Sequence, residues 1–378
     1  MRFPATLIAL ALAGAPSVHA AEPEVRIGSA SPASGPSAHL GKDTENGARL
    51  AIEDLNAQGL TIDGKKVKWV LLAEDDGGDP KQGTAVAQKL VDAGVVGVVG
   101  HLNSGTTVPA SKIYHSAGIP QITPSATTPL YTHQGFKSAF RVVANDNMIG
   151  GILGRYAVVT LKARRVAVID DRTAFGQGLA DEFIKGVKAA GATEIVSRQF
   201  TNDKASDFNA ILTQVRSRNP DLIFYGGMDA VAGPMLKQIK ALGMAVRFMG
   251  GDGVCSEKLP ILAGDGVGED KVTCAVAGGV SGAQEAVYAD FIARYRQRFH
   301  LELQTYAPYA YDAVMVLATA MHKARSSDPA KYLPELAKIK YQGITGSISF
   351  DPNGDLRDAA LTLYTYRNGK KTKMQVVR

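Results

Sequence analysis

Cysteine is scarce in this sequence, and long apolar runs are missing. The chain of 378 residues contains only two cysteines, Cys255 and Cys274. Beyond residue 20, no segment approaches the roughly 20 consecutive apolar residues that a membrane-spanning helix needs. No cysteine closely follows the N-terminal apolar segment, which argues against a lipid-anchored form. We therefore expect a soluble mature protein that is neither inserted in a membrane nor a lipoprotein.

The first twenty residues, 1–20, have the pattern of a cleaved signal peptide. Arg2 supplies an early positive charge, an apolar stretch follows from Leu7 to Ala13, and small residues stand at Val18 and Ala20. The apolar stretch is too short to anchor the chain in a bilayer. The pattern predicts export to the periplasm, with cleavage after Ala20.

Export bears on the two cysteines, because disulfides form and persist in oxidising compartments. We therefore expect a disulfide between Cys255 and Cys274, and the alternative is two buried free thiols. The formal charge of +6 comes from 42 basic residues spread among 36 acidic ones, without a basic stripe interleaved with aromatic residues. This distribution predicts no binding to nucleic acid.

Motifs of common enzymes are also missing. The glycine-rich stretch at 263–270 lacks the spacing of a dinucleotide loop, and no G-x-x-x-x-G-K-[ST] loop occurs. The seven histidines show no paired spacing for a metal. The G-x-S-x-G elbow of serine hydrolases is absent, although His101 precedes Ser104 closely. We expect no catalysis, no metal and no cofactor, and we interpret His101 as a structural or cleft-lining residue.

Strand-like runs alternate with helix patterns from the start of the expected mature chain. Ala48, Ala51, Ile52 and Leu55 form a helical stripe, and Asp79-Pro80 has the signature of a helix start. Short apolar runs typical of buried parallel strands lie at 25–30, 67–73, 95–100 and 119–123.

The same alternation starts again near residue 165. Its strand-like runs are RVAVID, EIVSRQF, DLIFYGG and VRFMGG. Two helices over 283–323 and strands over 344–378, with a turn at 351–355, complete the chain. This order predicts an α/β protein with two doubly wound lobes, each a parallel sheet covered by helices on both faces. Ligands of such folds bind beyond the C-terminal ends of the strands, in this case between the lobes.

Two clusters of small polar side chains follow predicted strands of the first lobe. Asn103 and Ser104 follow one strand, and Ser125 and Thr127 follow the next. Together with amide N–H groups at the following helix starts, these hydroxyls would form a cradle for an anion such as a carboxylate. The alternative is that Ser104 and Ser125 cap their own helices.

In the second lobe, Asp252 follows a strand-like run and lies between two glycines. Glycine allows close approach of the backbone, and an uncompensated buried charge would be costly. A ligand ammonium group would compensate this carboxylate. The alternative is an ordinary turn residue, because Gly-Asp-Gly is a common turn sequence.

From about Val25 to the C-terminus, the chain resembles the periplasmic leucine/isoleucine/valine-binding proteins of ABC transporters. The stretches that carry the resemblance are SGPSAHLGKDTENGARLAIEDLNAQG (34–59), DDGGDPKQGTAVAQKLV (75–91), GHLNSGTTVPAS (100–111), GIPQITPSATTP (118–129), FGQGLA (175–180), YGGMDA (225–230) and MGGDGV (249–254).

The resemblance implies a type I periplasmic binding fold with three crossovers between the lobes, which closes on an amino acid. Ser104 and Thr127 match the residues that hold the carboxylate of the ligand. Ser125 matches the residue whose backbone helps to hold the ammonium group, and Asp252 matches the acidic ammonium partner, which is commonly glutamate. The lobes implied are 21–143 plus 278–350, and 144–277 plus 351–378.

Some positions depart from the family pattern. Tyrosines that line the family's pocket are replaced by Leu40, Phe175 and Met228, and Gly78 and Asn103 stand where some members have a disulfide. The pocket is therefore more apolar. The expected ligand site comprises Ser104, Ser125, Thr127, Asp252, Phe175, Met228, Leu40, Leu102, Asn103 and Ala126.

These features predict a monomeric extracytoplasmic receptor that delivers an apolar, branched-chain L-amino acid to the membrane permease of an ABC transporter. One alternative is a sensor or uptake receptor of the same fold for an amide, an aromatic acid or another small carboxylate. A second alternative is an exported α/β hydrolase that uses Ser104.

Overall fold

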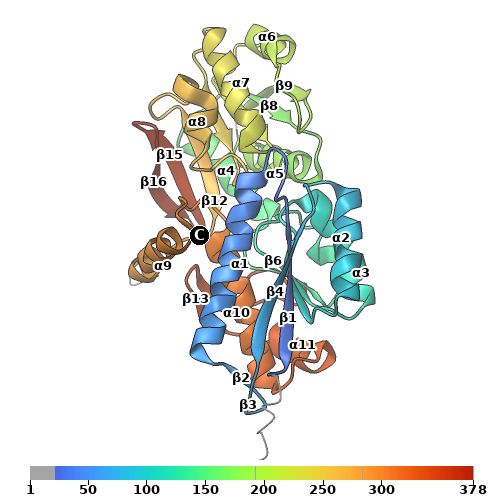
Figure 1. The fold of residues 1–378 in the computed structure, drawn as a ribbon. Helices are drawn as coiled ribbons and strands as arrows, with labels where there is room; N and C mark the ends of the chain where they lie inside the picture. Colours follow the sequence, from blue (N-terminus) through green and yellow to red (C-terminus); the bar gives the residue numbers. More distant parts are fainter. Residues whose placement is uncertain (1–21, 192, 283, 378) are drawn as a thin grey trace, which may run out of the picture.

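The computed structural model describes residues 22–191, 193–282 and 284–377. The predicted signal peptide lies outside the described residues. The chain forms two large sheets, one in each of two lobes that are stacked along the long axis of the molecule (Figure 1).

The first lobe is built on a parallel sheet of five strands. In spatial order these are β4 (Lys68–Asp75), β1 (Glu24–Ser31), β5 (Gly97–Gly100), β6 (Gln121–Thr123) and β7 (Ala139–Arg141). The neighbouring residues Val98 and Val99 join different apolar clusters, since successive side chains of a strand point to opposite faces. Both faces of this sheet are therefore buried.

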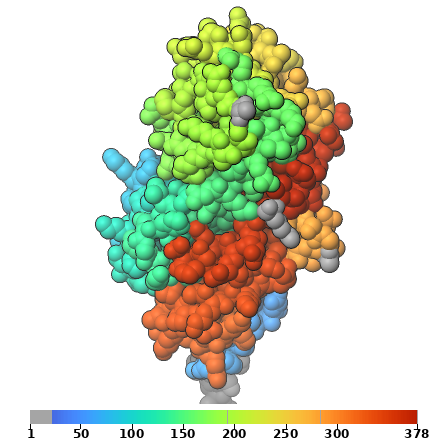
Figure 2. Space-filling view, turned by 180° about the vertical axis from the view of Figure 1, so that it is seen from behind, coloured from blue at the N-terminus to red at the C-terminus, as the bar shows by residue number. Residues whose placement is uncertain are grey.

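Helices cover each face of the first sheet. The helices α2 (Pro80–Asp92) and α3 (Ser104–Ser116) lie on one face, and α1 (Ala38–Gln58), α10 (Ala307–Ala324), α9 (Gln284–Phe299) and α11 (Pro329–Ala337) form the other layer. Asp79 caps α2 as the sequence predicts, because its carboxylate accepts hydrogen bonds from the Lys81 and Gln82 N–H groups at 2.9 Å each. From behind, the C-terminal part of the chain covers much of this lobe (Figure 2).

The second lobe contains a mixed sheet of seven strands. In spatial order these are β16 (Lys370–Val377), β15 (Leu361–Arg367), β12 (Val272–Ala277), β11 (Arg247–Gly250), β10 (Leu222–Gly226), β8 (Arg165–Asp170) and β9 (Glu194–Phe200). β15 runs antiparallel to both of its neighbours, β12 and β16, whereas the other five strands pair in parallel. The expectation of a purely parallel sheet is therefore wrong at this edge, because the chain returns from the first lobe as a hairpin whose first strand, β15, pairs antiparallel with β12.

The helices of the second lobe lie on both faces of its sheet. Figure 1 shows α7 in front of the sheet and α4 behind it. These helices are α4 (Asp146–Val159), α5 (Ala174–Ala190), α6 (Asn209–Ser217), α7 (Asp229–Ala241) and the short α8 (Leu259–Ala263). The remaining elements are small: β2 (Thr61–Ile62), β3 (Lys65–Lys66), β13 (Tyr341–Gly343), β14 (Gly346–Ile348), η1 (Thr132–Gln134) and η2 (Gly264–Gly266).

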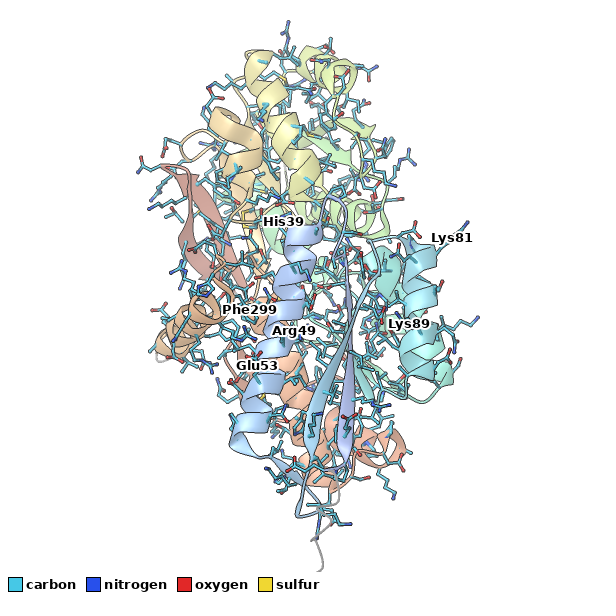
Figure 3. The ribbon with its side chains drawn as sticks, viewed as in Figure 1. His39, Arg49, Glu53, Lys81, Lys89 and Phe299 are labelled. Carbon is cyan, nitrogen blue, oxygen red and sulfur yellow. A yellow bond between two sulfur atoms is a disulfide. The ribbon has the colours of Figure 1, made fainter. Side chains whose placement is uncertain are left out.

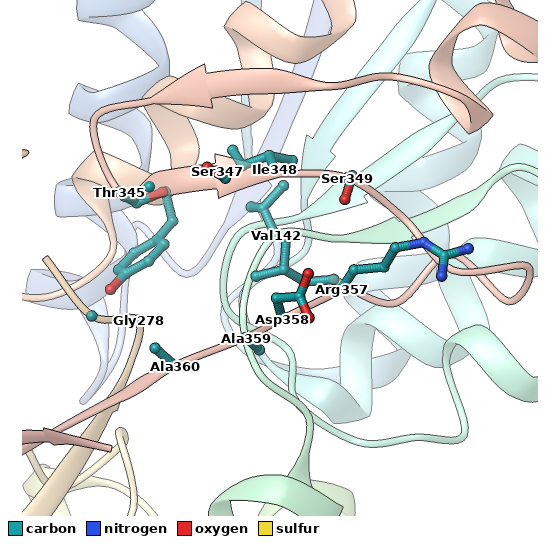
Figure 4. A pocket seen from close by; sticks show the side chains of 14 residues that line it. Val142, Gly278, Thr345, Ser347, Ile348, Ser349, Arg357, Asp358, Ala359 and Ala360 are labelled. Carbon is teal, nitrogen blue, oxygen red and sulfur yellow. The ribbon is translucent and has the colours of Figure 1, made fainter. Parts of the chain in front are cut away.

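The chain passes between the two sheets three times, after β7, after β12 and between β14 and β15. A pocket of about 270 Å³ lies at these crossovers. It is lined among others by Val142, Gly278 and Ala360 (Figure 4). Arg141 and Asp355 join the first and third crossovers through an ion pair of 2.8 Å in which the arginine is fully buried. The predicted fold with two lobes and three crossovers is confirmed. Among the described helices, none has the length and apolarity to cross a membrane.

Candidate ligand-binding cleft

The C-terminal ends of strands from both sheets meet at a narrow cavity between the lobes, which we call the inner pocket. It has only about 10 Å³ of free volume. Its walls consist of Leu102, Asn103, Ser104, Ser125, Ala126, Phe175, Met228, Asp252 and Tyr306. Eight of these nine residues belong to the ligand site expected from the sequence. The other two expected residues, Leu40 and Thr127, lie behind this wall.

The hydroxyls of Ser104 and Ser125 come from successive strand ends and are almost fully buried. Ser104 is the first residue of α3, and its Oγ accepts a weak hydrogen bond from Thr128 N–H at 3.4 Å. Ser125 Oγ donates to the Leu102 carbonyl at 2.9 Å. Neither serine caps a helix, so the capping alternative is wrong for both.

No helix follows the second cluster directly. After β6 the chain turns through residues 124–128 and reaches only the 3-10 turn η1. Thr123 organises this turn, because its hydroxyl oxygen accepts the Ala126 N–H at 2.9 Å. The expected helix start after Ser125 is therefore wrong, and of the two hydroxyl clusters only the first is followed by a helix start, that of α3.

Thr127 is fully buried beside Asp146, the first residue of α4. The Thr127 hydroxyl and both carboxylate oxygens of Asp146 make no well-aligned hydrogen bond to any described residue. Burial raises the pKa of Asp146 to about 7, and the negative charge of Asp252 adds to this rise, while the Thr127 hydroxyl opposes it. A buried carboxylate of this kind favours a neighbouring cation or proton.

Asp252 lies in the turn after β11 and is 2% exposed. Tyr306 Oη donates to its Oδ2 at 2.8 Å, while Oδ1 accepts no well-aligned hydrogen bond from the part of the chain that the structure describes. Burial raises the pKa of Asp252 to about 6, and the Tyr306 hydroxyl partly opposes this rise. Asp252 is therefore both a turn residue and a carboxylate that faces the inner pocket.

The glycine after Asp252 has a packing role. A Cβ atom on Gly253 would lie 2.7 Å from Met228 Sδ and 2.9 Å from Phe175 Cε1. The missing side chain thus admits the two apolar side chains that line the pocket beside the carboxylate.

A disulfide fixes the same turn. Cys255 and Cys274 are bonded, with their Cα atoms 5.4 Å apart, as the sequence predicts. Cys274 lies on β12, so the bond ties the turn that carries Asp252 to the neighbouring strand. The alternative of two free thiols is wrong.

Apolar contact between the lobes surrounds the inner pocket. Leu40, Leu102 and Tyr306 of the first lobe form one buried cluster, and Met228 of the second lobe packs against it. Leu40 therefore supports the pocket wall without lining it.

A polar contact between the lobes lies next to this cluster. His39 Nε2 lies 2.7 Å from Asp229 Oδ2, and Ser256 Oγ donates to the same carboxylate oxygen. Figure 3 shows His39 at the end of α1 that faces the second lobe. Asp229 is fully buried, so this contact is shielded from solvent.

His101 has a structural environment. Its Nδ1 lies 2.7 Å from Asp76 Oδ2 and its Nε2 lies 3.0 Å from Tyr114 Oη, and all atoms of this contact are buried. Both ring nitrogens are thus engaged away from Ser104, which argues against a serine–histidine pair. Within the described ranges, no cluster of three or more histidine, cysteine or acidic residues could hold a metal ion.

Sequence reasoning missed Tyr306, which lines the inner pocket, and Asp146, which is buried beside Thr127. Tyr306 precedes α10, and the N–H groups of residues 304–307 bind the Asp43 carboxylate on α1, which fixes the position of the tyrosine. No local pattern around Tyr306 indicates a cleft. Asp146 follows the helix cap Asn145 and lies in the first turn of α4. Acidic residues are common there because they interact favourably with the helix dipole, so the sequence offered no reason to expect another role.

Comparisons with known proteins point to one family. The family described as periplasmic binding protein matches residues 24–371. The chain is 34% identical over 358 residues to the Leu/Ile/Val-binding protein homolog 1 of Brucella abortus, with 94% of each chain covered. It is also 34% identical to the leucine-, isoleucine-, valine-, threonine- and alanine-binding protein of Pseudomonas aeruginosa, over 95% of this chain and 94% of the relative.

A solved structure extends this likeness to three dimensions. The branched-chain amino acid transporter substrate binding protein of Streptococcus pneumoniae, in complex with isoleucine, is 28% identical to this chain with a TM-score of 0.84. The likeness covers 94% of this chain and 99% of that chain.

Proposed function

Because the chain belongs to the Leu/Ile/Val-binding group of the periplasmic binding proteins, we propose that it captures an apolar L-amino acid in the cleft between its lobes. One observation carries the proposal for this site. The buried carboxylate of Asp252 has an acceptor oxygen without a hydrogen bond from any described residue, and it shares the inner pocket with the hydroxyl cluster of the other lobe. An acid on one lobe and hydroxyls with helix amides on the other are complementary to the ammonium and carboxylate groups of an amino acid.

The two charged groups of the ligand have separate partners in this proposal. Ser104 and Thr127 hold the carboxylate, together with the amides at the first turn of α3. Asp252 and the Ser125 carbonyl hold the ammonium group.

The side chain of the ligand contacts apolar residues from both lobes. We assign this role to Leu40, Leu102, Phe175 and Met228, with Asn103 and Ala126 completing the wall. Leu40 does not line the inner pocket in this arrangement of the lobes, and we propose that it meets the ligand side chain once the lobes part, because it packs against Leu102 and Met228.

The energetics of such a site are sufficient for transport. Micromolar affinity corresponds to about 8 kcal/mol. Hydrogen bonds to charged groups contribute roughly 1.5 to 3 kcal/mol each, so a few of them together with apolar burial reach this value. Binding requires no covalent chemistry, and we propose that the protein binds its ligand without turnover.

Ligand binding favours the closed arrangement, since its partners come from both lobes. We propose that a monomer with lobes 21–143 plus 278–350 and 144–277 plus 351–378 acts in the periplasm after loss of residues 1–20. The closed form then delivers the amino acid to the permease of an ABC transporter.

Thermal shift measurements on refolded protein test this function. The protein is unfolded, freed of bound ligand, refolded and heated with single L-amino acids or simple carboxylic acids. At a hundredfold excess over the dissociation constant, a true ligand adds about 2.7 kcal/mol of stability. We expect stabilisation by apolar amino acids and none by their decarboxylated amines.

The same experiment separates the alternatives. An amide, or an aromatic acid without an amino group, that binds more tightly than leucine would favour the sensor or uptake receptor for small carboxylates. The replacement of the pocket tyrosines by Leu40, Phe175 and Met228 is the reason to consider this alternative. Ester or amide hydrolysis that disappears in Ser104→Ala would favour the hydrolase.

A further inference from the structure

A second cavity adjoins the inner pocket, and we call it the outer pocket. Its volume is about 560 Å³, within the range of roughly 300 to 1,000 Å³ that is typical of small-molecule sites. Asn103, Ser104, Phe175 and Met228 line both cavities. The inner pocket, with about 10 Å³, must widen to admit the charged groups of a ligand, and a ligand held there can extend its side chain directly into the outer pocket.

The outer pocket is larger than a branched aliphatic side chain requires. A water molecule has a share of roughly 30 Å³ in the liquid, so the cavity corresponds to nearly twenty water molecules. An isobutyl or isopropyl group would leave most of this space to solvent. The volume favours a side chain with a large rigid ring system, which buries more apolar area for little loss of conformational freedom.

The walls of the outer pocket suit an aromatic ring. Phe175 and Met228 pack together over Gly253 at the junction of the two cavities, and Pro36 and Pro80 add apolar surface. Aromatic rings pair favourably with other rings and with methionine sulfur. The four side chains therefore offer an apolar slot that continues from the charged inner pocket.

The charges around the outer pocket balance. Asp171 and Asp203 face it together with Arg172 and Lys204, and of these four residues only Asp171 is buried. The Thr173 N–H and hydroxyl groups donate to Asp171 Oδ1 at 3.0 and 2.6 Å. These hydrogen bonds stabilise the negative charge of the Asp171 carboxylate without a ligand. The lining thus provides no excess of either sign that would select an acidic or a basic side chain.

Asn103 provides an acceptor at the junction. Its Oδ1 is buried and accepts no hydrogen bond from the described residues. Because this oxygen is not exposed to the cavity, an indole N–H could donate to it only after the Asn103 amide turns toward the outer pocket, and a purely aliphatic side chain could not donate at all.

We propose that the preferred substrates are L-amino acids with bulky aromatic side chains, which place the ring in the outer pocket. This inference rests on the amino-acid function proposed above. Calorimetry on stripped and refolded protein, with tryptophan, phenylalanine, leucine and alanine as probes, tests the proposal. We expect tryptophan and phenylalanine to bind at least tenfold more tightly than leucine. Leucine binding as tight as that of both aromatic amino acids, or tighter, would overturn it.

Two variants test the position of the ring. Ala230→Phe and Ala174→Phe each add a ring to a wall of the outer pocket, away from the residues that hold the charged groups. We expect either variant to weaken tryptophan binding at least tenfold while leucine binding changes less than threefold. Ala189→Phe, on the exposed side of α5, is the matched control and should change neither affinity.

The outcomes separate this inference from the proposed function. Retained leucine binding shows that each variant is folded. Unchanged tryptophan binding in both filled variants would show that the ring lies elsewhere and would overturn the inference. Failure of every amino acid to bind would overturn the amino-acid function and this inference with it, whereas tight leucine binding with weak tryptophan binding would overturn the inference alone.

Discussion

Tyr306 donates a hydrogen bond of 2.8 Å to Asp252, and this bond joins the two lobes at the inner pocket. The tyrosine lies at the start of α10 in the first lobe, and the aspartate lies after β11 in the second. The tyrosine occupies one carboxylate oxygen and leaves the other without a donor among the described residues. Tyr306 thereby orients the carboxylate that we assign to the ligand's ammonium group.

Asp252→Asn should weaken amino-acid binding strongly, because it removes the negative charge opposite the ammonium group. The loss of a hydrogen bond to a charged group corresponds to roughly 1.5 to 3 kcal/mol, or about tenfold to over a hundredfold in affinity. Calorimetry measures this change. Asp265→Asn, at an exposed carboxylate, is the control. Unchanged affinity in Asp252→Asn would remove this residue from the site.

Tyr306→Phe should make binding more sensitive to pH. The Tyr306 hydroxyl lowers the pKa of Asp252, so its removal moves that pKa further above about 6 and protonates the carboxylate at higher pH. We expect a larger loss of affinity at pH 6 than at pH 8. The matched control is Tyr311→Phe, which removes a tyrosine bond to Asp54 elsewhere on α10. Parallel pH profiles of Tyr306→Phe and wild type would contradict the prediction.

Asp252 should destabilise the ligand-free protein at neutral pH. Because its folded-state pKa is raised from 3.8 to about 6, its contribution to stability is present below the unfolded-state pKa and is lost as the pH rises through about 6. Relative to wild type, ligand-free Asp252→Asn should therefore gain roughly 2.5 kcal/mol in the free energy of unfolding between pH 4 and pH 8. Urea denaturation at both pH values measures this gain. A pH-independent difference would show that the carboxylate stays solvated.

The contact between His39 and Asp229 should contribute to closure. Both partners lie on different lobes, 2.7 Å apart, so breaking the contact removes an interaction that the closed arrangement makes. We expect His39→Ala and Asp229→Asn each to weaken ligand binding, with a coupling of roughly 1 kcal/mol in a double-mutant cycle. Strictly additive effects would show that the pair does not act together.

The disulfide should stabilise the fold and the turn that carries Asp252. For a loop of this size, the chain-entropy model gives about 3 kcal/mol. Cys255→Ser/Cys274→Ser should lower the free energy of unfolding by about this amount in urea denaturation and should also weaken ligand binding. Reduction of the wild-type protein with dithiothreitol should reproduce both effects. Lower stability with unchanged affinity would show that the turn carrying Asp252 keeps its geometry without the disulfide.

Local patterns were sufficient to predict most of the architecture. Short apolar runs predicted the central strands of both sheets, because strands buried on both faces need apolar side chains throughout. The helix α11 was not predicted, since its segment carries prolines at Pro329 and Pro334 that also suit a turn. The antiparallel edge was missed for a similar reason: strand direction depends on the connection rather than on the strand's own residues.

The sequence by itself determined which polar side chains stand at strand ends. Ser104, Ser125 and Asp252 could be identified because parallel strands of a buried sheet end at one edge, and this follows from local periodicity. Their roles in binding stay predictions.

Only the tertiary structure decided which partners these residues meet. Tyr306 reaches Asp252 because Asp43, far away in the sequence, fixes the start of α10, and Thr127 meets Asp146 because the first crossover brings α4 against the other lobe. The helix expected after Ser125 did not form, since Thr123 holds a turn there instead. Such contacts depend on the packing of segments that are distant in the chain, and that packing sets the burial and therefore the pKa of each carboxylate.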